Sequence, residues 1–173
     1  PVVIGNVANP VTTYGIPFGL SYKYSYSQQI YTAEEIGGAK SINGISLQYF
    51  YAYPVTRNVD IYLGHTNKTG FSYSDWVPQS NLTLVYSGNV EFNNTGENFW
   101  LWIPFDTVFE YNGTDNLVVA FDDNTGSAPS YGNVFYSHSS GKLSIYVSNY
   151  STDVDPNNLG SNGNPIWYRN NLS

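Results

Sequence analysis

The side chains that could perform nucleophilic or acid-base chemistry are few. The chain has no cysteine and two histidines, His65 and His138. Neither histidine lies in a GxSxG, HExxH or triad-like spacing, so both are expected to be surface or structural residues. The sequence gives no support for a thiol, serine or metal-dependent hydrolase.

Two pairs of adjacent carboxylates, Glu34-Glu35 and Asp122-Asp123, are the other candidates. Glycosidases use two carboxylates on opposite sides of a cleft. Glu35 follows Thr32 at the spacing of a capping box, which predicts a short helix start. The Asp122-Asp123 pair is typical of a turn. We therefore predict that the protein is not an enzyme.

Oxygen-rich residues in two polar stretches suggest a calcium site. Asp122, Asp123 and Asn124 lie in one stretch, and Asp153 and Asp155 in another. Calcium takes six to eight oxygen ligands, and two converging loops would supply several of them. The alternative is that these side chains only form turns through their own hydrogen bonds. The predicted metal ligands are Asp122, Asp123, Asp153 and Asp155.

Exposed aromatic rings could bind sugars by stacking against their apolar faces. Trp100 and Trp102 lie two residues apart in the sequence FWLWIPF and would share one face of a strand. They form a candidate stacking platform for a polysaccharide. The alternative is that both faces of this strand are buried.

The elements that would position these residues are strands. Apolar and polar residues alternate around residues 45–53, 58–63 and 99–105, and shorter runs around 25–31, 82–92, 116–121, 134–137, 143–148 and 165–169 are also strand-like. The inward positions of the strongest alternations predict the core, which comprises Ile45, Leu47, Val59, Ile61, Leu63, Leu101, Ile103, Leu117, Val119 and Phe121.

Turn sequences separate these runs, including Asn43-Gly44, Ser140-Gly141 and Asn162-Gly163. About ten short strands with regular turns predict an all-β protein, a single jelly-roll-like antiparallel β-sandwich. The only helical signal, TAEEIG at residues 32–37, predicts a single turn. Residues 10–173 are expected to form the sandwich domain.

Residues 1–9 form a separate N-terminal strand segment. Val2, Val3, Ile4 and Val7 make it apolar, and the sequence Ala-Asn-Pro at 8–10 separates it from the next run. Such a segment can fold back onto its own sheet. It can also insert into the edge of a neighbouring molecule as a donor strand and so build a head-to-tail fibre.

Composition limits the partners. The net charge is -7, with only 6 Lys and Arg residues, which disfavours nucleic acid and anionic membrane surfaces. No apolar run approaches the roughly 20 residues of a spanning helix, so no membrane insertion is expected. Low charge, many Tyr, Asn, Ser and Thr residues, and no Cys or Met favour an extracellular or cell-surface location.

Several motifs carry a resemblance to a known group of proteins. The sequences SYSQQIYTAEEIG, RNVDIYLGHTNKTGF and YNGTDNLVVAFDDNTGS, within residues 25–127, are similar to a recurrent domain of secreted Bacteroidota proteins. This resemblance implies a jelly-roll accessory module, near cleaved-adhesin and carbohydrate-binding modules. It also implies O-glycosylation at Thr107, since Asp106-Thr107-Val108 is similar to the Bacteroidota signal.

Two functions follow as predictions. The first is an extracellular structural or adhesive subunit that assembles with copies of itself through residues 2–7. The second is a non-catalytic carbohydrate-binding module, with calcium as its only expected cofactor. The separable apolar segment favours the first, whereas a segment paired only within its own chain would favour the second.

Overall fold

A computed structural model describes residues 1–128 and 133–173 and has an all-β fold, as predicted. Short helical turns are present at α1 (Ala33–Ile36) and η1 (Gln79–Asn81). The nine strands are β1 (Val11–Thr13), β2 (Tyr24–Tyr31), β3 (Lys40–Tyr51), β4 (Val55–Thr66), β5 (Thr83–Phe92), β6 (Gly96–Tyr111), β7 (Asn116–Asp123), β8 (Val134–Asn149) and β9 (Asn164–Asn170).

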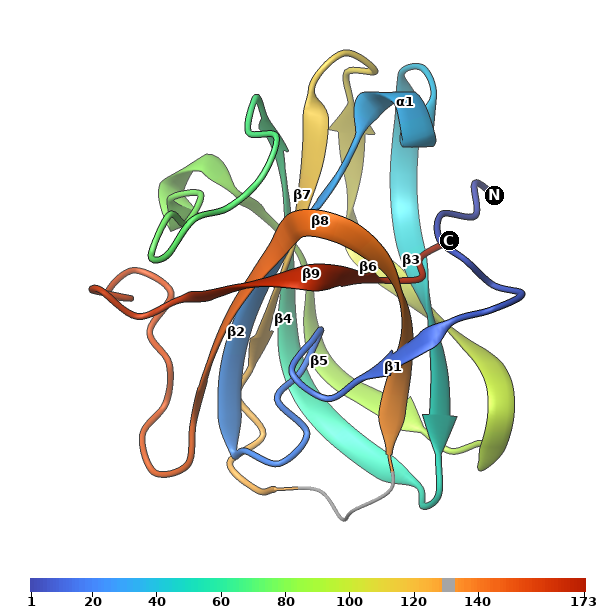
Figure 1. The fold of residues 1–173 in the computed structure, drawn as a ribbon, viewed down its shortest axis with the longest axis vertical. Coiled ribbons are helices and arrows are strands. Elements are labelled where there is room, and N and C mark those ends of the chain that lie inside the picture. The colour runs from blue at the N-terminus through green and yellow to red at the C-terminus, as the bar shows by residue number, and fades with distance from the viewer. Residues whose placement is uncertain (129–132) are drawn as a thin grey trace.

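All strand pairs are antiparallel and belong to one sheet, with the order β5-β4-β7-β2-β8-β3-β6. β1 and β9 both pair with the long strand β8. The sheet curves so strongly that its first and last strands meet, and the Ser87 amide of β5 donates to Asp106 Oδ2 of β6 at 3.2 Å. The result is a sandwich-like sheet that is nearly closed into a barrel (Figure 1).

The core lies inside this curved sheet. Of the ten residues predicted for it, all are buried except Leu101, which is half-buried and packs against the core. Phe18 joins them from the chain before β2, and its ring meets Phe92, Phe121 and Phe135 edge-to-face. Such aromatic contacts add to the stabilisation from apolar burial. The predicted strand faces are therefore confirmed.

Three turn predictions are wrong. Asn43-Gly44 does not separate two strands but lies inside β3, where the pairing with β6 is irregular between Ile42 and Gly44. Asp122 and Asp123 are the last residues of β7, where both make ladder pairs with β2 and β4. Ser140-Gly141 does not separate two strands but lies inside β8. Gly141 has a φ of +74°, and the pairing of β8 with β9 is irregular between Ser139 and Ser144. The glycine therefore marks a bulge-like irregularity in one strand.

The helical turn α1 begins as predicted. Thr32 accepts a hydrogen bond from the Glu35 amide, and the Glu35 side chain accepts one from the Thr32 amide. Glu35 also forms an ion pair with Arg169 of β9, which is 2% exposed. No helix among the described residues is long and apolar enough to span a membrane.

The two ends of the chain lie side by side (Figure 1). Leu172 pairs with Leu47 of β3 on one side and with Ile4 on the other. The C-terminal residues therefore extend the sheet from β3, and residue 4 adds a further one-residue bridge at its rim. Residues 1–7 do not form a regular strand.

Candidate functional site

Exposed aromatic side chains gather where β1, β8 and β9 meet. Tyr14, Trp167 and Tyr168 are 60%, 59% and 42% exposed. They line one open groove of about 410 Å³, which we call the aromatic groove, and its other lining residues are Thr12, Thr13, Gly15, Tyr146, Pro165 and Ile166. No Asp, Glu, Lys or Arg is among these described lining residues.

The floor of the aromatic groove is held by the sheet. Thr13 pairs with Phe135 of β8, and its hydroxyl lies 2.8 Å from the Ser137 hydroxyl. Gly15 lies against the Tyr146 ring, so closely that a Cβ there would come within 3.2 Å of it. The backbone of the groove is thus built on paired strands, with Tyr14 directly after the last residue of β1.

Sequence reasoning missed this groove. Its aromatic residues come from positions 14, 146 and 167–168, and only the pairing of β1 and β9 with β8 brings them together. One local signal existed, because Trp167 and Tyr168 are adjacent and neighbouring residues of a strand point to opposite faces. Alternation along this strand would have placed at least one of the two rings outside the core.

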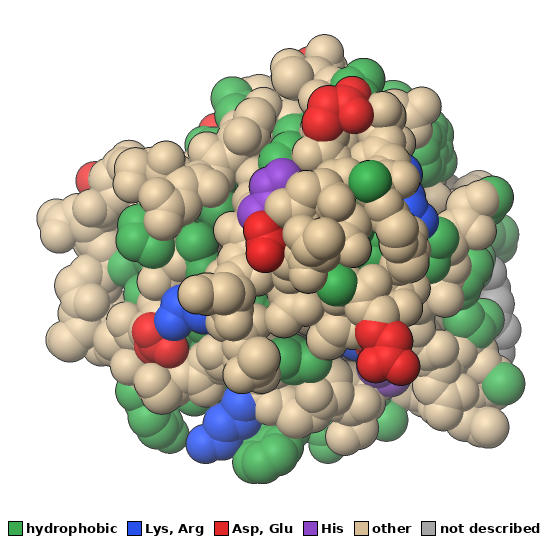
Figure 2. Space-filling model, turned by 90° about the horizontal axis from the view of Figure 1, so that it is seen from above, with side chains coloured by type: hydrophobic (Ala, Val, Ile, Leu, Met, Phe, Trp, Pro, Cys, Tyr) green, Lys and Arg blue, Asp and Glu red, His purple; other side chains and the backbone are tan. Residues whose placement is uncertain are grey.

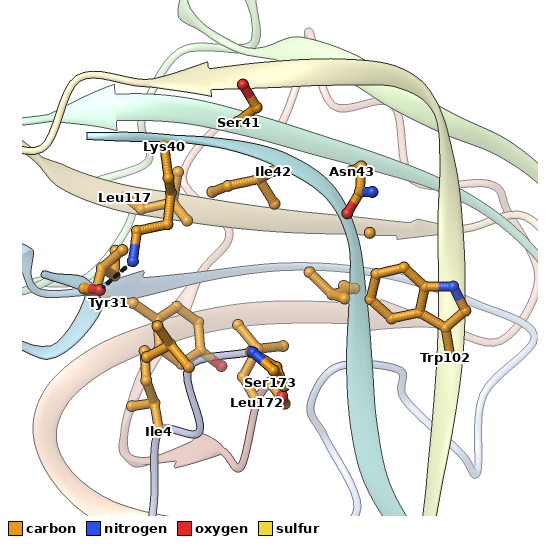
Figure 3. A pocket seen from close by; sticks show the side chains of 15 residues that line it. Ile4, Tyr31, Lys40, Ser41, Ile42, Asn43, Trp102, Leu117, Leu172 and Ser173 are labelled. Carbon is orange, nitrogen blue, oxygen red and sulfur yellow. Dashed lines mark hydrogen bonds between the residues drawn. The ribbon is translucent and has the colours of Figure 1, made fainter. Parts of the chain in front are cut away.

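A second cavity lies beside the N-terminus. This N-terminal pocket has a volume of about 300 Å³ and is mostly apolar. Figure 3 shows Ile4, Leu172 and Ser173 together along one side, with Trp102 at one end and Tyr31 and Lys40 at the other. The pocket brings together Val2 and Ile4 of the predicted assembly strand and Trp102 of the predicted stacking pair, with Ile36, Ile42, Ile45 and Leu117 as further apolar lining.

Residues 1–7, the N-terminal segment, are attached at one main position. Ile4 and Leu172 exchange two backbone hydrogen bonds of 2.8 and 3.0 Å, and Asn171 Nδ2 donates to the Asn6 carbonyl at 3.4 Å. Val2, Val3 and Val7 are 37%, 56% and 39% exposed. Within the single chain the segment is therefore folded back, and three of its four predicted assembly residues face solvent.

The two predicted stacking tryptophans differ in exposure. Trp102 is 50% exposed, and its ring packs so closely on Gly44 of β3 that a side chain at that position would collide with it. Trp100 lies opposite Gln48 and is half-buried. Trp102 presents the larger surface to a ligand, so the two residues do not form an equal pair.

The structure separates the four predicted calcium ligands. Asp123 is fully buried and forms an ion pair with Arg57. Asp155 is exposed, and it accepts a hydrogen bond of 2.9 Å from the Asn157 amide. Asp122 interacts electrostatically with Asp153 and more weakly with Asp123.

Asp122 is the unusual member of this group. It is 4% exposed, and its Oδ1 has no hydrogen-bond partner among the described residues. Burial raises the pKa of Asp122 to about 7, and the carboxylates of Asp153, Asp60 and Asp123 add to this rise. Within residues 1–128 and 133–173 no three His, Cys, Asp or Glu side chains form a metal-binding cluster. Calcium held by Asp122 and Asp153 would therefore need backbone oxygens and water for its other ligands.

The calcium prediction is tested by chelation at pH 8, where Asp122 is ionised. An ion bound only to the folded state at 100 times its Kd adds about 2.7 kcal/mol. Removing it with excess chelator is expected to lower the Tm by about 5–10 °C for a domain of this size. Asp122→Asn should melt at the same temperature with and without calcium. Identical melting of the parent protein in calcium and in chelator would exclude the site.

Both histidines have structural contacts, as expected. His65 lies 5.0 Å from the Phe109 ring, centroid to centroid, and its Nε2 accepts a hydrogen bond from the Asn112 amide. His138 lies between Arg169 and Asn171. Burial lowers the pKa of His138, and the Arg169 guanidinium lowers it further.

The face seen from above carries no continuous charged patch. Figure 2 shows acidic and basic side chains there as separate spots among uncharged and hydrophobic side chains. Thr107, the predicted glycosylation residue, is exposed on β6. Its modification stays a prediction.

Comparison with protein families, with curated proteins and with solved structures gives no match to this chain. The resemblance to secreted Bacteroidota domains therefore stays a prediction. The functional argument rests on the residues of the aromatic groove and of the N-terminal pocket.

Proposed function

We propose that the protein is a non-catalytic carbohydrate-binding module that holds an uncharged polysaccharide in the aromatic groove. The observation that carries this proposal is that Tyr14, Trp167 and Tyr168 line one groove while each is at least 42% exposed. Single exposed apolar side chains are common on protein surfaces, but a group of them indicates a binding surface. In the single chain the N-terminal segment pairs with its own Leu172, so glycan binding in the groove needs no neighbouring copy.

The chemistry of the groove fits a sugar chain. A pyranose ring has an apolar face of C–H groups, which stacks on an aromatic ring, and a rim of hydroxyl groups. The groove offers aromatic faces together with the hydroxyls of Tyr14, Tyr168 and Thr12. A mostly apolar cavity with a few polar groups is the usual form of a small-ligand site. Lys142 Nζ lies 5.5 Å from the Trp167 ring centroid, but no charged side chain is among the described lining residues, and the net charge of the protein is -7. We therefore expect neutral glycans to bind better than acidic ones.

Trp102 supports a second contact surface for the same class of ligand. Its indole is half-exposed at the end of the N-terminal pocket, near Asn43 and Ser41. This second surface lies where β6 pairs with β3, whereas the aromatic groove lies where β1 and β9 pair with β8. Variants of the two sites therefore distinguish them. We place this activity outside the cell, in agreement with the low fraction of charged residues and the absence of cysteine.

Replacing Trp167 or Tyr168 by alanine is expected to weaken glycan binding about tenfold. Stacking a sugar buries about 50 Å² of apolar surface per ring, worth about 1.3 kcal/mol, which corresponds to about a tenfold change in Kd. A screen of soluble and insoluble neutral polysaccharides identifies the ligand, and titration calorimetry measures each variant.

The matched control is Tyr73→Ala, because Tyr73 is 74% exposed and does not line the groove. This variant should bind as the parent does. If Trp102→Ala abolishes binding while the groove variants bind normally, the ligand occupies the other site. Parental affinity in all of these variants would refute the stacking proposal.

A further inference from the structure

We propose that the N-terminal segment exchanges between copies of this protein, so that Ile4 of one copy pairs with Leu172 of the next. This proposal goes beyond glycan binding and does not depend on it. The predicted donor strand then has a defined acceptor. That acceptor is the N-terminal pocket with its edge residue Leu172.

The acceptor belongs to the body of its own chain. Leu172 forms a bridge with Leu47, and Ser173 and Ser46 exchange backbone hydrogen bonds of 2.6 and 3.1 Å. These contacts do not involve the N-terminal segment. The acceptor therefore stays in place when the segment leaves.

Departure of the N-terminal segment exposes an unpaired strand edge and an apolar surface. The amide and carbonyl of Leu172 lose their partners on Ile4, and an open strand edge of this kind pairs readily with another chain. The pocket also loses the wall formed by Pro1, Val2 and Ile4 and exposes its apolar lining, which includes Ile36, Ile45 and Leu117. The same segment of a second copy fits this site because it offers identical side chains and backbone groups.

The segment can leave without breaking the sheet. Residues 5–9 belong to no strand, and all five are exposed. The next paired residue is Val11, which lies opposite Ser137 of β8. Residues 5–10 therefore connect the bridge at Ile4 to β1 as a hinge, whose opening breaks the hydrogen bond from Asn171 Nδ2 to the Asn6 carbonyl and the close packing of Gly5 on Asn171 and His138. Exchange of an identical element through a hinge is a low-cost route to association.

The geometry of the exchange sets the form of the assembly. Each copy donates one segment and accepts one, so exchange yields a reciprocal dimer, a larger closed ring or an open head-to-tail chain. Such an assembly displays one aromatic groove per copy. Linked grooves would raise the apparent affinity for a long polysaccharide by about 10²–10⁴ without any new contact.

The absence of cysteine from the chain makes a crosslinking test clean. Ile4 and Leu172 exchange both backbone hydrogen bonds, and such pairs have Cα atoms about 5.5 Å apart, within the range that a disulfide spans. A mixture of the single variants Ile4→Cys and Leu172→Cys is oxidised and separated on a non-reducing gel. We expect a disulfide-linked heterodimer at a yield at least tenfold above that of the control mixture of Ile4→Cys with Thr107→Cys.

Two further variants keep the test decisive. The double variant Ile4→Cys, Leu172→Cys, oxidised at low concentration, locks the segment in its own chain and should stay monomeric in sedimentation when concentrated. Deletion of residues 1–9 removes the donor and leaves the acceptor open, so this variant, with its folding checked by thermal melting, should cap the assemblies of the parent protein and shorten them when the two are mixed. Assembly of the locked double variant to the parental extent, or parental assemblies that the deletion variant does not shorten, would overturn the proposal.

Measurements on the parent protein show whether a second copy or another ligand occupies the N-terminal pocket. If it sediments as a monomer at all concentrations and gives no heterodimer above the control, exchange is refuted. If in addition the deletion variant binds a fluorescent fatty acid in the N-terminal pocket, the occupant is a lipid chain rather than a second copy. The heterodimer yield, sedimentation and fatty-acid binding do not depend on glycan affinity. A negative result for exchange therefore leaves the proposed function intact, and a negative result for glycan binding leaves the exchange proposal intact.

Discussion

Replacing Asp123 by alanine is expected to lower the free energy of unfolding by about 3–5 kcal/mol, because it leaves a buried guanidinium without its counter-charge. Arg57 and Asp123 are 1% and 0% exposed. A guanidinium that loses its partner in the interior stays desolvated. The free-energy cost of its burial is then no longer offset and lowers the stability of the folded state.

The geometry of the pair explains why it is tolerated in the core. Arg57 donates to Asp123 Oδ2 from Nε at 3.0 Å and also from Nη2, while its Nη1 donates to the Ser127 carbonyl at 3.1 Å. Asp123 Oδ1 accepts from the Thr125 amide at 3.1 Å. Burial raises the pKa of the Asp123 carboxyl, and the Arg57 guanidinium opposes this rise. Each polar atom involved therefore has a partner, which a truncated variant would lack.

Urea unfolding followed by tryptophan fluorescence measures the effect. Glu34→Gln changes an exposed carboxylate and should stay within about 0.5 kcal/mol of the parent protein. The double variant Arg57→Met, Asp123→Leu removes both charges and should be more stable than Asp123→Ala, since an apolar pair needs no counter-charge. Parental stability of Asp123→Ala would show that the ion pair does not contribute as its burial implies.

This pair also shows what the sequence could not reveal. Local alternation predicted the inward faces of β3, β4 and β7, because a period of two is read from neighbouring residues. Arg57 precedes this alternation in β4, and its partner lies 66 residues away. Asp122-Asp123 matches turn chemistry locally, but pairing with β2 and β4 extends β7 through both residues. Tertiary pairing here overrides the local signal.

The candidate sites show the same limit. The exposed Trp102 and the apolar residues 2–7 were found from sequence because each signal lies within one short segment. The aromatic groove combines Tyr14 with Trp167 and Tyr168, which only the long strand β8 brings together. The acceptor for Ile4 is likewise the C-terminal Leu172. Sites assembled from distant segments require the topology, which local periodicity does not contain.

A second large effect is expected from pH. Asp122 interacts electrostatically with Asp153 of the loop that follows β8, and Val154 of the same loop packs with Tyr26, the ladder partner of Asp122. Its folded pKa is about 7, against an ordinary value of 3.8. Between these values the folded state holds a proton that the unfolded state has lost. The stability from Asp122 is therefore complete below about pH 4 and is lost as the pH rises towards 7 and above.

A shift of this size corresponds to about 4 kcal/mol, at about 1.4 kcal/mol per pH unit. Other groups also titrate, since the pKa of Glu35 and that of His138 are both lowered. The decisive quantity is therefore the difference in free energy of unfolding between Asp122→Asn and the parent protein. Asparagine resembles the protonated carboxyl, so this difference should be near zero at pH 4. It should reach about 4 kcal/mol in favour of the variant at pH 8.

Asp153→Asn separates the two main causes of the raised pKa. Burial is the larger cause and stays in this variant, while the repulsion from the Asp153 carboxylate is removed. We expect a smaller loss of stability between pH 4 and pH 8 than in the parent protein, but not its disappearance. Urea unfolding at four pH values between 4 and 8, in chelator so that no cation contributes, measures all three proteins. A difference between Asp122→Asn and the parent that stays constant across this range would mean that Asp122 has an ordinary pKa and is hydrated.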